Sequence, residues 1–217
     1  MKVINLGESN SVLNSFVAQM RDKKIQKNSL LFRTNLRRTG EIFAYEISKT
    51  LNYTPKDVVT PLGTAHMQLC DSKVVVATIL RAGLPLHDGI LSFFDGAENA
   101  FLAAKRIYDR SDKFQVNSEY CITPSLEGKV LILADTMMAT GASFVLAYEK
   151  LVAEGGKPEH THIVCPISCE EAVETLKKRL PRSVTLWTAA IDEELTGHAY
   201  VIPGLGDAGD LAYGSKL

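Results

Sequence analysis

Apolar residues recur along the first fifty positions with the spacing of amphipathic helices. Val12, Phe16 and Met20 would share one helix face. A second periodic segment carries Leu30, Leu31, Leu36, Ile42, Phe43 and Ile47. Charged residues fill the gaps, and the run of arginines in the second segment is typical of a solvated helix face. The pattern predicts that residues 1–50 form a helical N-terminal segment.

Beyond this segment, short apolar runs alternate with helical stretches. The expected strands are 58–61, 74–80, 100–104, 130–134, 161–167 and 183–190. The expected helices are 85–94, 144–154 and 170–180. Continuous apolar runs are typical of parallel strands covered on both faces. The alternation therefore predicts an α/β fold with a parallel sheet flanked by helices. The polar segment 108–123 is expected to form an exposed hairpin or flap.

The segment 135–143 joins an apolar strand to a helix through an acid and small residues. It reads Asp-Thr-Met-Met-Ala-Thr-Gly-Ala-Ser. Small side chains let backbone amides approach an anion at a helix start, where the helix dipole favours negative charge. The segment lacks the Walker A lysine and the Gly-x-Gly-x-x-Gly pattern. An ordinary capped strand-turn-helix is the alternative interpretation.

Basic residues follow two of the expected strands. Arg81 comes after the run 74–80, and Lys105 and Arg106 come after 100–104. Open α/β sheets bind ligands at the carboxyl ends of their strands. These cations are therefore candidates for binding an anion, with a plain surface charge as the alternative for Arg81.

The tail loses periodicity from Ile191 onward. Four glycines lie between positions 197 and 209, together with Pro203, so a backbone-dominated loop is expected. Its apolar residues predict that it packs against the body instead of forming a flexible end. These residues are Val201, Ile202, Leu205 and Ala208. The spacing of a calcium-binding EF-hand loop is absent.

Four stretches together resemble the type I phosphoribosyltransferases, and among them the uracil phosphoribosyltransferases. They are 135–143, Ile79-Leu-Arg-Ala-Gly-Leu84, Lys105-Arg106 and the run 200–210, which is the most specific. The resemblance spans roughly residues 32–214. The usual loop of that family reads Asp-Pro-Met-Leu-Ala-Thr-Gly-Gly-Ser, so this chain departs at Thr136, Met138 and Ala142. If position 142 required a positive φ, its alanine would cost about 1 kcal/mol or more.

The resemblance implies transfer of phosphoribose from 5-phospho-α-D-ribose 1-diphosphate (PRPP) to uracil, giving UMP and diphosphate. It implies catalytic roles for Asp135, Arg81 and Asp207. The implied PRPP contacts are Arg81, Arg106, Asp135, Thr136, Met137, Met138, Ala139, Thr140, Gly141, Ala142, Ser143 and Asp207. The implied uracil contacts are Val201, Gly206, Asp207 and Ala208. Mg²⁺ is expected to be held through the diphosphate and not by a protein metal site.

The resemblance also implies a hood built from N- and C-terminal segments, a β-arm at 108–124 that joins subunits, and a homodimer or higher homo-oligomer. GTP activates some relatives and is a possible activator here. Three alternatives stay open: a phosphoribosyltransferase for another base, an RNA-binding regulator on the same fold, and a non-catalytic nucleotide sensor. The five histidines are scattered without helical pair spacing, which gives little support to a histidine base.

Length and composition narrow the possible classes of protein. A chain of 217 residues fits one domain comprising the helical segment 1–50, the arm 108–124 and the tail loop 191–217. The net charge is −1, from 24 basic and 25 acidic residues, which argues against nucleic acid as a partner. No apolar run reaches the length of a membrane span. The four cysteines lack Cys-x-x-Cys spacing and the start lacks an apolar signal core, so a cytoplasmic protein with buried, reduced Cys165 and Cys169 is expected.

Overall fold

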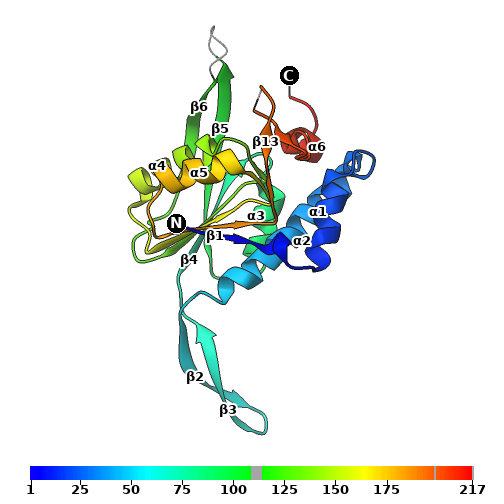
Figure 1. Cartoon of the computed structure of the whole chain (residues 1–217). Coiled ribbons are helices and arrows are strands. Elements are labelled where there is room, and N and C mark those ends of the chain that lie inside the picture. Colours follow the sequence, from blue (N-terminus) through cyan, green and yellow to red (C-terminus); the bar gives the residue numbers. More distant parts are fainter. Residues whose placement is uncertain (109–113, 198, 217) are drawn as a thin grey trace.

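The computed structural model describes residues 1–108, 114–197 and 199–216, with the side chains of 104–119 outside the description. A seven-stranded sheet in the order β1-β11-β9-β7-β4-β5-β6 forms its centre (Figure 1). The strands are β1 (Lys2–Asn5), β4 (Val74–Leu80), β5 (Glu98–Tyr108), β6 (Phe114–Ile122), β7 (Val130–Ala134), β9 (His160–Val164) and β11 (Val184–Thr188). All neighbours pair in parallel except β5 and β6. The predicted α/β fold is confirmed.

Helices cover both faces of this sheet (Figure 1). The described helices are α1 (Val12–Arg21), α2 (Ser29–Ser48), α3 (Leu84–Leu91), α4 (Ala142–Gly155), α5 (Glu170–Arg179) and α6 (Ala208–Tyr213), with the short 3-10 turns η1 (Leu6–Glu8) and η2 (Ile25–Lys27). Ser11 and Asn28 accept hydrogen bonds from backbone N–H groups in the first turns of α1 and α2. Side-chain caps of this kind satisfy amides that a helix start leaves unpaired.

Alternate side chains of each central strand enter two different core layers. Val75 and Ala77 of β4 pack in the layer that includes α4 and α5. Val74 and Val76 pack in the layer that includes α2 and α3. Successive side chains of a strand point to opposite faces, so a continuous apolar run is what a strand buried on both faces requires.

The first residues of the chain depart from the expected helix. Lys2–Asn5 forms the edge strand β1, which pairs in parallel with β11. Val3 and Ile4 are partly buried there and pack on the two core layers. Both residues are β-branched, and such residues fit the pleated surface of a sheet. A run of four residues is too short to predict from sequence that this segment pairs with β11.

A hairpin projects from the body where only a short strand, 58–61, was expected. It is formed by β2 (Tyr53–Thr60) and β3 (Gly63–Cys70), which are antiparallel (Figure 1). Nearly every residue of the two strands is exposed, and Leu62 at the tip is fully exposed. Strand signals rely on a half-buried face, which this hairpin lacks within one chain.

Three main strands continue beyond the sheet as a small second sheet. Its members are β8 (Met137–Met138), β10 (Ile167–Cys169) and β12 (Ala190–Asp192), in the parallel order β12-β10-β8. They follow β7, β9 and β11 in the chain, so they lie at the carboxyl edge of the main sheet. The backbone of this edge is therefore held by hydrogen bonds beyond the point where the main strands end.

The tail contains more regular structure than expected. β13 (Glu194–Leu195) and β14 (Val201–Ile202) pair antiparallel, and α6 follows. Val201, Leu205 and Ala208 are buried as predicted, whereas Ile202 is exposed, contrary to the prediction. Short glycine-flanked elements such as α6 carry little periodic signal.

Three further expectations concern the cysteines, the flap and membrane-spanning helices. Cys165 and Cys169 are buried free thiols, as predicted. The expected flap 108–123 contains β6, which pairs antiparallel with β5; residues 109–113 of the flap lie outside the described residues, as does His198. Among the described helices, none has the length and apolarity needed to cross a membrane.

The two-layer core generates a stability prediction. Leu133→Ala removes a fully buried side chain of β7 and should lower the free energy of unfolding by about 2–5 kcal/mol. The matched control Leu30→Ala changes a side chain of α2 that is 69% exposed and should stay within about 0.5 kcal/mol. Denaturant unfolding measures both; equal losses would contradict the assignment of β7 to the core.

Candidate active site

Two of the predicted site residues follow neighbouring strands at the centre of the sheet. Arg81 follows β4 and Asp135 follows β7, and these strands pair in parallel up to Thr78 and Ala134. The chain continues from β4 to β5 on one side, while β7, β9, β11 and β1 lie on the other. Such a reversal leaves a crevice at the carboxyl ends of the strands, so the fold brings Arg81 and Asp135 to the edge where a ligand is expected.

Asp135 is fixed by its neighbours. Its backbone N–H donates to the carbonyl of Val164 at 3.1 Å, which ties it to the end of β9. Its Oδ1 accepts the backbone N–H of Thr136 at 2.7 Å. Thr136 is buried and stands where the related loops have proline, which has no N–H to donate. The substitution therefore adds a hydrogen bond that orients the carboxylate.

The loop that follows is pinned at both ends. Met137 and Met138 pair with β10 as strand β8. Met138 and Ala139 are buried in the core layer of α4 and α5. Thr140 and Gly141 then lead into α4, which begins at Ala142 and includes Ser143.

The positive φ of this loop falls on Gly141, not on Ala142. Gly141 has φ 80° and a Cβ there would lie 3.1 Å from the carbonyl oxygen of Ala172. Ala142 begins α4 and is not among the described residues with positive φ. The conditional strain considered for alanine at 142 therefore does not arise. Gly141 offers no capping side chain, so amides at the start of this 14-residue helix can bind an anion.

Arg81 lies against the C-terminal tail. Its Nη2 is 3.3 Å from Asp210 Oδ1 and 3.3 Å from the carbonyl oxygen of Gly214. Glycine at position 83 lets the turn after β4 lie close to the ends of β4 and β7. A Cβ on Gly83 would lie 2.2 Å from Thr78 Oγ1 of β4 and 3.0 Å from the carbonyl oxygen of Ala134 of β7. The peptide bonds Leu80–Arg81 and Ile202–Pro203 are both cis.

Asp207 places a carboxylate beside Arg81. A Cβ on Gly209 would lie 3.2 Å from Asp207 Oδ1 and 3.6 Å from Arg81 Nη2. Burial raises the pKa of Asp207, but the backbone N–H of Asp210 and the ammonium of Lys216 outweigh it and leave the pKa below its ordinary value. Asp207 is therefore ionised at neutral pH. It also caps α6 by accepting the Asp210 N–H at 3.0 Å.

The segment predicted to contact uracil combines buried apolar side chains with an exposed stretch of backbone. Val201 and Ala208 are buried in the same core layer as Met138 of the loop after β7. Gly206 is exposed, has φ 90°, and a Cβ there would have only Gln26 Oε1 nearby, at 3.9 Å. The backbone around Gly206 can therefore face a ligand.

Arg106 reaches the same edge by its backbone. β5 pairs with β4 up to Ala103, and Arg106 lies three residues further along β5, opposite Val116 of β6. Its side chain is outside the description, so its contact with a ligand stays a prediction.

Sequence reasoning missed several residues that hold the tail. Arg33, interpreted as belonging to a solvated face, donates from Nη1 to the carbonyl oxygen of Ala212 at 2.7 Å and so joins α2 to α6. Arg21 and Asp192 form a bidentate ion pair. These two residues are 171 positions apart in the chain, so no local pattern could have revealed the pair.

A cavity of about 270 Å³ lies at the opposite end of the strands. Lys2, Val130, His160 and Trp187 are among its lining residues. Among the side chains that the structure describes, no predicted site residue lines it. His162 beside it has a pKa lowered to about 3 by burial and by His160, and its Nδ1 accepts the Trp187 Nε1–H at 3.0 Å. His162 is therefore neutral and belongs to packing at the far end of the sheet.

The parallel sheet and the loop after β7 agree with the type I phosphoribosyltransferase class that the sequence resembles. A solved protein of Aquifex aeolicus is 26% identical to this chain and superimposes with a TM-score of 0.87 over 98% of each chain. A second solved structure, from Thermus thermophilus, is similar in fold alone, with 16% identity, a TM-score of 0.50, and coverage of 75% of this chain and 86% of that one.

The family model described as uracil phosphoribosyltransferase matches residues 8–215. A uracil phosphoribosyltransferase of Porphyromonas gingivalis is 49% identical over 217 residues, covering 100% of both chains. One of Methanothermobacter thermautotrophicus is 37% identical over 187 residues, covering 84% of this chain and 83% of its own. The chain belongs to the uracil phosphoribosyltransferase family.

The geometry at Gly141 yields a prediction about the loop. Gly141→Ala should lower the free energy of unfolding by about 1 kcal/mol or more, because L-residues disfavour this φ. Ala142→Gly, which restores the usual family residue, should change it by less than about 1 kcal/mol. Thermal unfolding of both variants checks this. A gain in stability from Ala142→Gly, with little loss from Gly141→Ala, would show that the strained position had been misassigned.

Proposed function

We propose that the chain transfers phosphoribose from PRPP to N1 of uracil, giving UMP and diphosphate. The observation that carries the proposal is the meeting of four elements at one sheet edge. These are the helix start after Gly141, the Asp135 carboxylate, the Arg81 guanidinium, and the exposed backbone near Gly206. Membership of the uracil phosphoribosyltransferase family supports the same reaction.

Each element has a role in this proposal. The amides and hydroxyls from Thr140 to Ser143 bind the 5′-phosphate, because the start of α4 favours an anion. Asp135 accepts hydrogen bonds from the ribose hydroxyls. Arg81 and Arg106 bind the diphosphate. The backbone from Gly206 to Ala208, with Val201, binds uracil through its alternating donor and acceptor edge.

The proposed reaction requires little covalent chemistry from the protein. Diphosphate leaves with its charge neutralised, while positive charge develops on the ribose ring and N1 of uracil attacks. Positioning and fixed charges therefore supply the acceleration. The ionised Asp207 lies where it can stabilise that positive charge or orient the diphosphate, and both roles remain within the proposal.

A metal carried by the diphosphate of the substrate would need few ligands from the protein. Among the described side chains, no group of three or more His, Cys, Asp or Glu residues could hold a metal ion. Mg²⁺ commonly keeps its waters and binds through one or two carboxylates plus substrate phosphates, and Asp135 and Asp207 are carboxylates of this edge. When bound, Mg²⁺ would neutralise the diphosphate; the protein's role is to orient it.

Arg81 must exchange partners when PRPP binds. In the structure its Nη2 lies near Asp210 and the Gly214 carbonyl. The contact with Asp210 is long and 42% of the Arg81 side chain is exposed. An exposed ion pair contributes little free energy, so a diphosphate can displace it.

The decisive assay is steady-state UMP formation from uracil, PRPP and Mg²⁺, with cytosine, hypoxanthine and orotate as competing bases. The proposal predicts turnover with uracil alone. Turnover with another base instead would make the chain a different phosphoribosyltransferase. Binding of UMP without any turnover would identify a nucleotide sensor and reject the enzyme proposal.

Arg81→Ala tests the diphosphate role. Hydrogen bonds to charged groups contribute about 1.5–3 kcal/mol, so kcat/KM for PRPP should fall roughly 10- to 100-fold. The control Arg37→Ala removes an arginine of α2 that pairs with Glu41 on an exposed helix face and should leave kcat/KM unchanged. Full activity of Arg81→Ala at limiting PRPP would remove Arg81 from the site.

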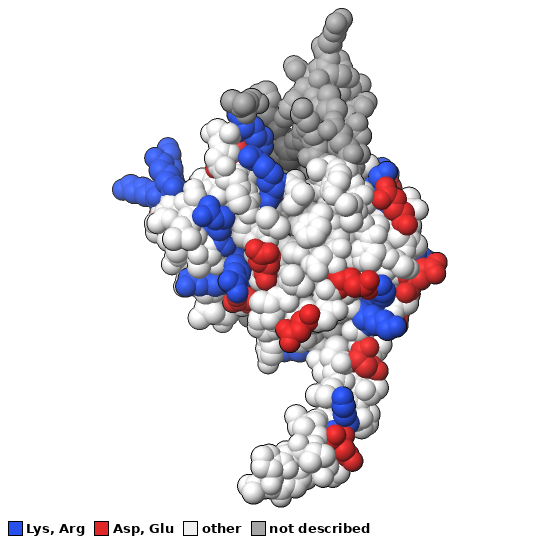
Figure 2. All heavy atoms as spheres, turned by 180° about the vertical axis from the view of Figure 1, so that it is seen from behind, with Lys and Arg blue, Asp and Glu red and all other residues white. Residues whose placement is uncertain are grey.

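A homo-oligomer belongs to the proposal, with the hairpin β2–β3 as one contact surface. Isolated two-stranded hairpins are at best marginally stable, yet this one exposes Val59, Leu62 and Met67. Residues 58–65 at the far end of the hairpin contain no Lys, Arg, Asp or Glu, and Figure 2 shows this end uncoloured on the face in view, whereas charges of both signs are interspersed on the body. A second copy of the chain would cover these apolar residues. Joining of subunits by 108–124, GTP activation and a cytoplasmic location stay predictions.

Leu62→Asp should weaken self-association because it places a charge at the apolar tip. Sedimentation velocity should show a shift toward monomer at micromolar concentration. Leu30→Asp, which places the same charge on an exposed position of α2, serves as the control. An unchanged sedimentation coefficient for Leu62→Asp would exclude the hairpin as a contact surface.

A further inference from the structure

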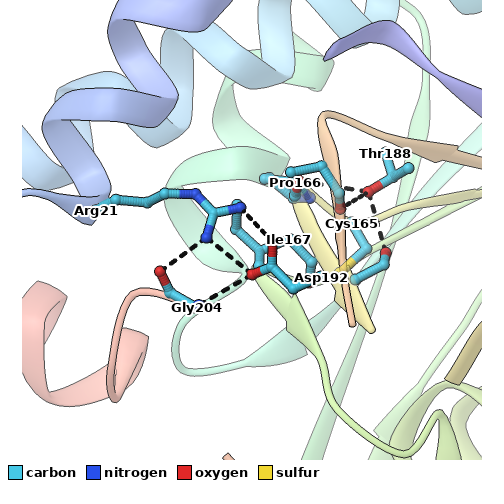
Figure 3. A network of polar contacts seen from close by, with 9 residues as sticks. Arg21, Cys165, Pro166, Ile167, Thr188, Asp192 and Gly204 are labelled. Carbon is cyan, nitrogen blue, oxygen red and sulfur yellow. Dashed lines mark hydrogen bonds and ion pairs between the residues drawn. The ribbon is translucent and has the colours of Figure 1, made fainter. Parts of the chain in front are cut away.

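One ion pair holds both backbone polar groups of a single tail residue. Arg21, the last residue of α1, binds Asp192 with two hydrogen bonds of 2.8 Å (Figure 3). Asp192 Oδ2 also accepts the N–H of Gly204 at 2.9 Å. Arg21 Nη1 donates to the carbonyl oxygen of Gly204 at 3.0 Å. The pair therefore bonds both the N–H and the carbonyl group of Gly204, as a neighbouring β-strand would.

Both partners of the pair stand on rigid supports. Asp192 ends β12, which pairs with β10, and Thr188 at the end of β11 bonds to Ser168 and Ala190. On the other side, Gln26 Nε2 donates to the carbonyl oxygen of Arg21 at 3.1 Å. Asp192 is only 7% exposed. A buried bidentate pair with added hydrogen bonds fixes geometry far better than a surface pair.

Gly204 lies between the two halves of the segment assigned to uracil. Val201 precedes it and Gly206 follows it. Gly204 has φ 50°, and a Cβ there would lie 2.2 Å from the carbonyl oxygen of Val201. The turn therefore has little freedom to move without carrying Val201 and Gly206 with it.

We propose that Arg21 and Asp192 are positioning residues for base binding: the ion pair clamps the turn at Gly204 and so sets the backbone that reads uracil. This inference rests on the proposed function, because it assumes that the segment 201–208 binds the base. Neither side chain is assigned a contact with substrate. Their effect passes through the N–H and carbonyl of Gly204.

The chemistry of arginine suits this role. Its planar fork reaches one carboxylate with two nitrogens while a third hydrogen bond goes to the Gly204 carbonyl. Lysine offers a single ammonium and cannot reproduce the fork. Removal of either partner leaves the other charge without its pair in a largely buried place, which is costly.

The kinetic test compares Arg21→Met and Arg21→Lys with the control Arg179→Met. Arg179 pairs with Glu149 on an exposed surface. Misplacement of a binding group can cost up to about 100-fold, so Arg21→Met should raise KM for uracil roughly 10- to 100-fold while KM for PRPP stays within about twofold. Arg21→Lys should restore only a fraction of the loss. An equal rise in both KM values, or no rise, would overturn the positioning role.

Amide hydrogen exchange tests the clamp without any substrate. In Arg21→Met, the Gly204 amide and its neighbours in the tail should exchange faster, while β7 amides keep their protection. Asp192→Asn provides a second variant should Arg21→Met fail to fold. Unchanged exchange at Gly204 in the folded variant would overturn the clamp. If the wild-type chain makes no UMP but the exchange result holds, the proposed function fails and the clamp stands as a property of the tail.

Discussion

The parallel pairing of β4 with β7 is the constraint on which the rest of the site depends. It sets the ends of two neighbouring strands side by side, so Arg81 and Asp135 meet at one edge although they lie far apart in the chain. Gly83 lets the turn after β4 pack against the ends of both strands, because a Cβ there would lie 2.2 Å from Thr78 Oγ1 of β4 and 3.0 Å from the carbonyl oxygen of Ala134 of β7. Every other site element is arranged around this junction.

The small sheet and two arginines of the N-terminal helices support this edge. The small sheet β12-β10-β8 extends three strands and fixes the backbone of the loop after β7. The tail is then tied down by arginines of the N-terminal helices, Arg33 through Ala212 and Arg21 through Gly204. A binding segment made of backbone needs such external support, because glycine-rich chain has little order of its own.

Much of this could be predicted from sequence, for identifiable reasons. The strand β7 and the acid after it stand out because a continuous apolar run ends abruptly at Asp135. Arg81 stands out for the same reason. In contrast, the hairpin β2–β3 buries nothing within the chain and leaves no apolar periodicity to read. The ion pair of Arg21 with Asp192 joins positions whose proximity exists only in the folded chain. The effect of the loop's differences from the usual family sequence could not be predicted either, since only the φ values of the folded chain show that Gly141 and not Ala142 has the left-handed conformation.

In the proposed site, one sheet edge binds phosphate, ribose and base in that spatial order. A crystal structure of the chain with bound UMP would show whether it does. We expect the 5′-phosphate on the amides at the start of α4, the ribose hydroxyls on Asp135, and the base against the backbone from Gly206 to Ala208. UMP bound instead in the cavity beside His160 and Trp187, or with its phosphate away from α4, would exclude this arrangement.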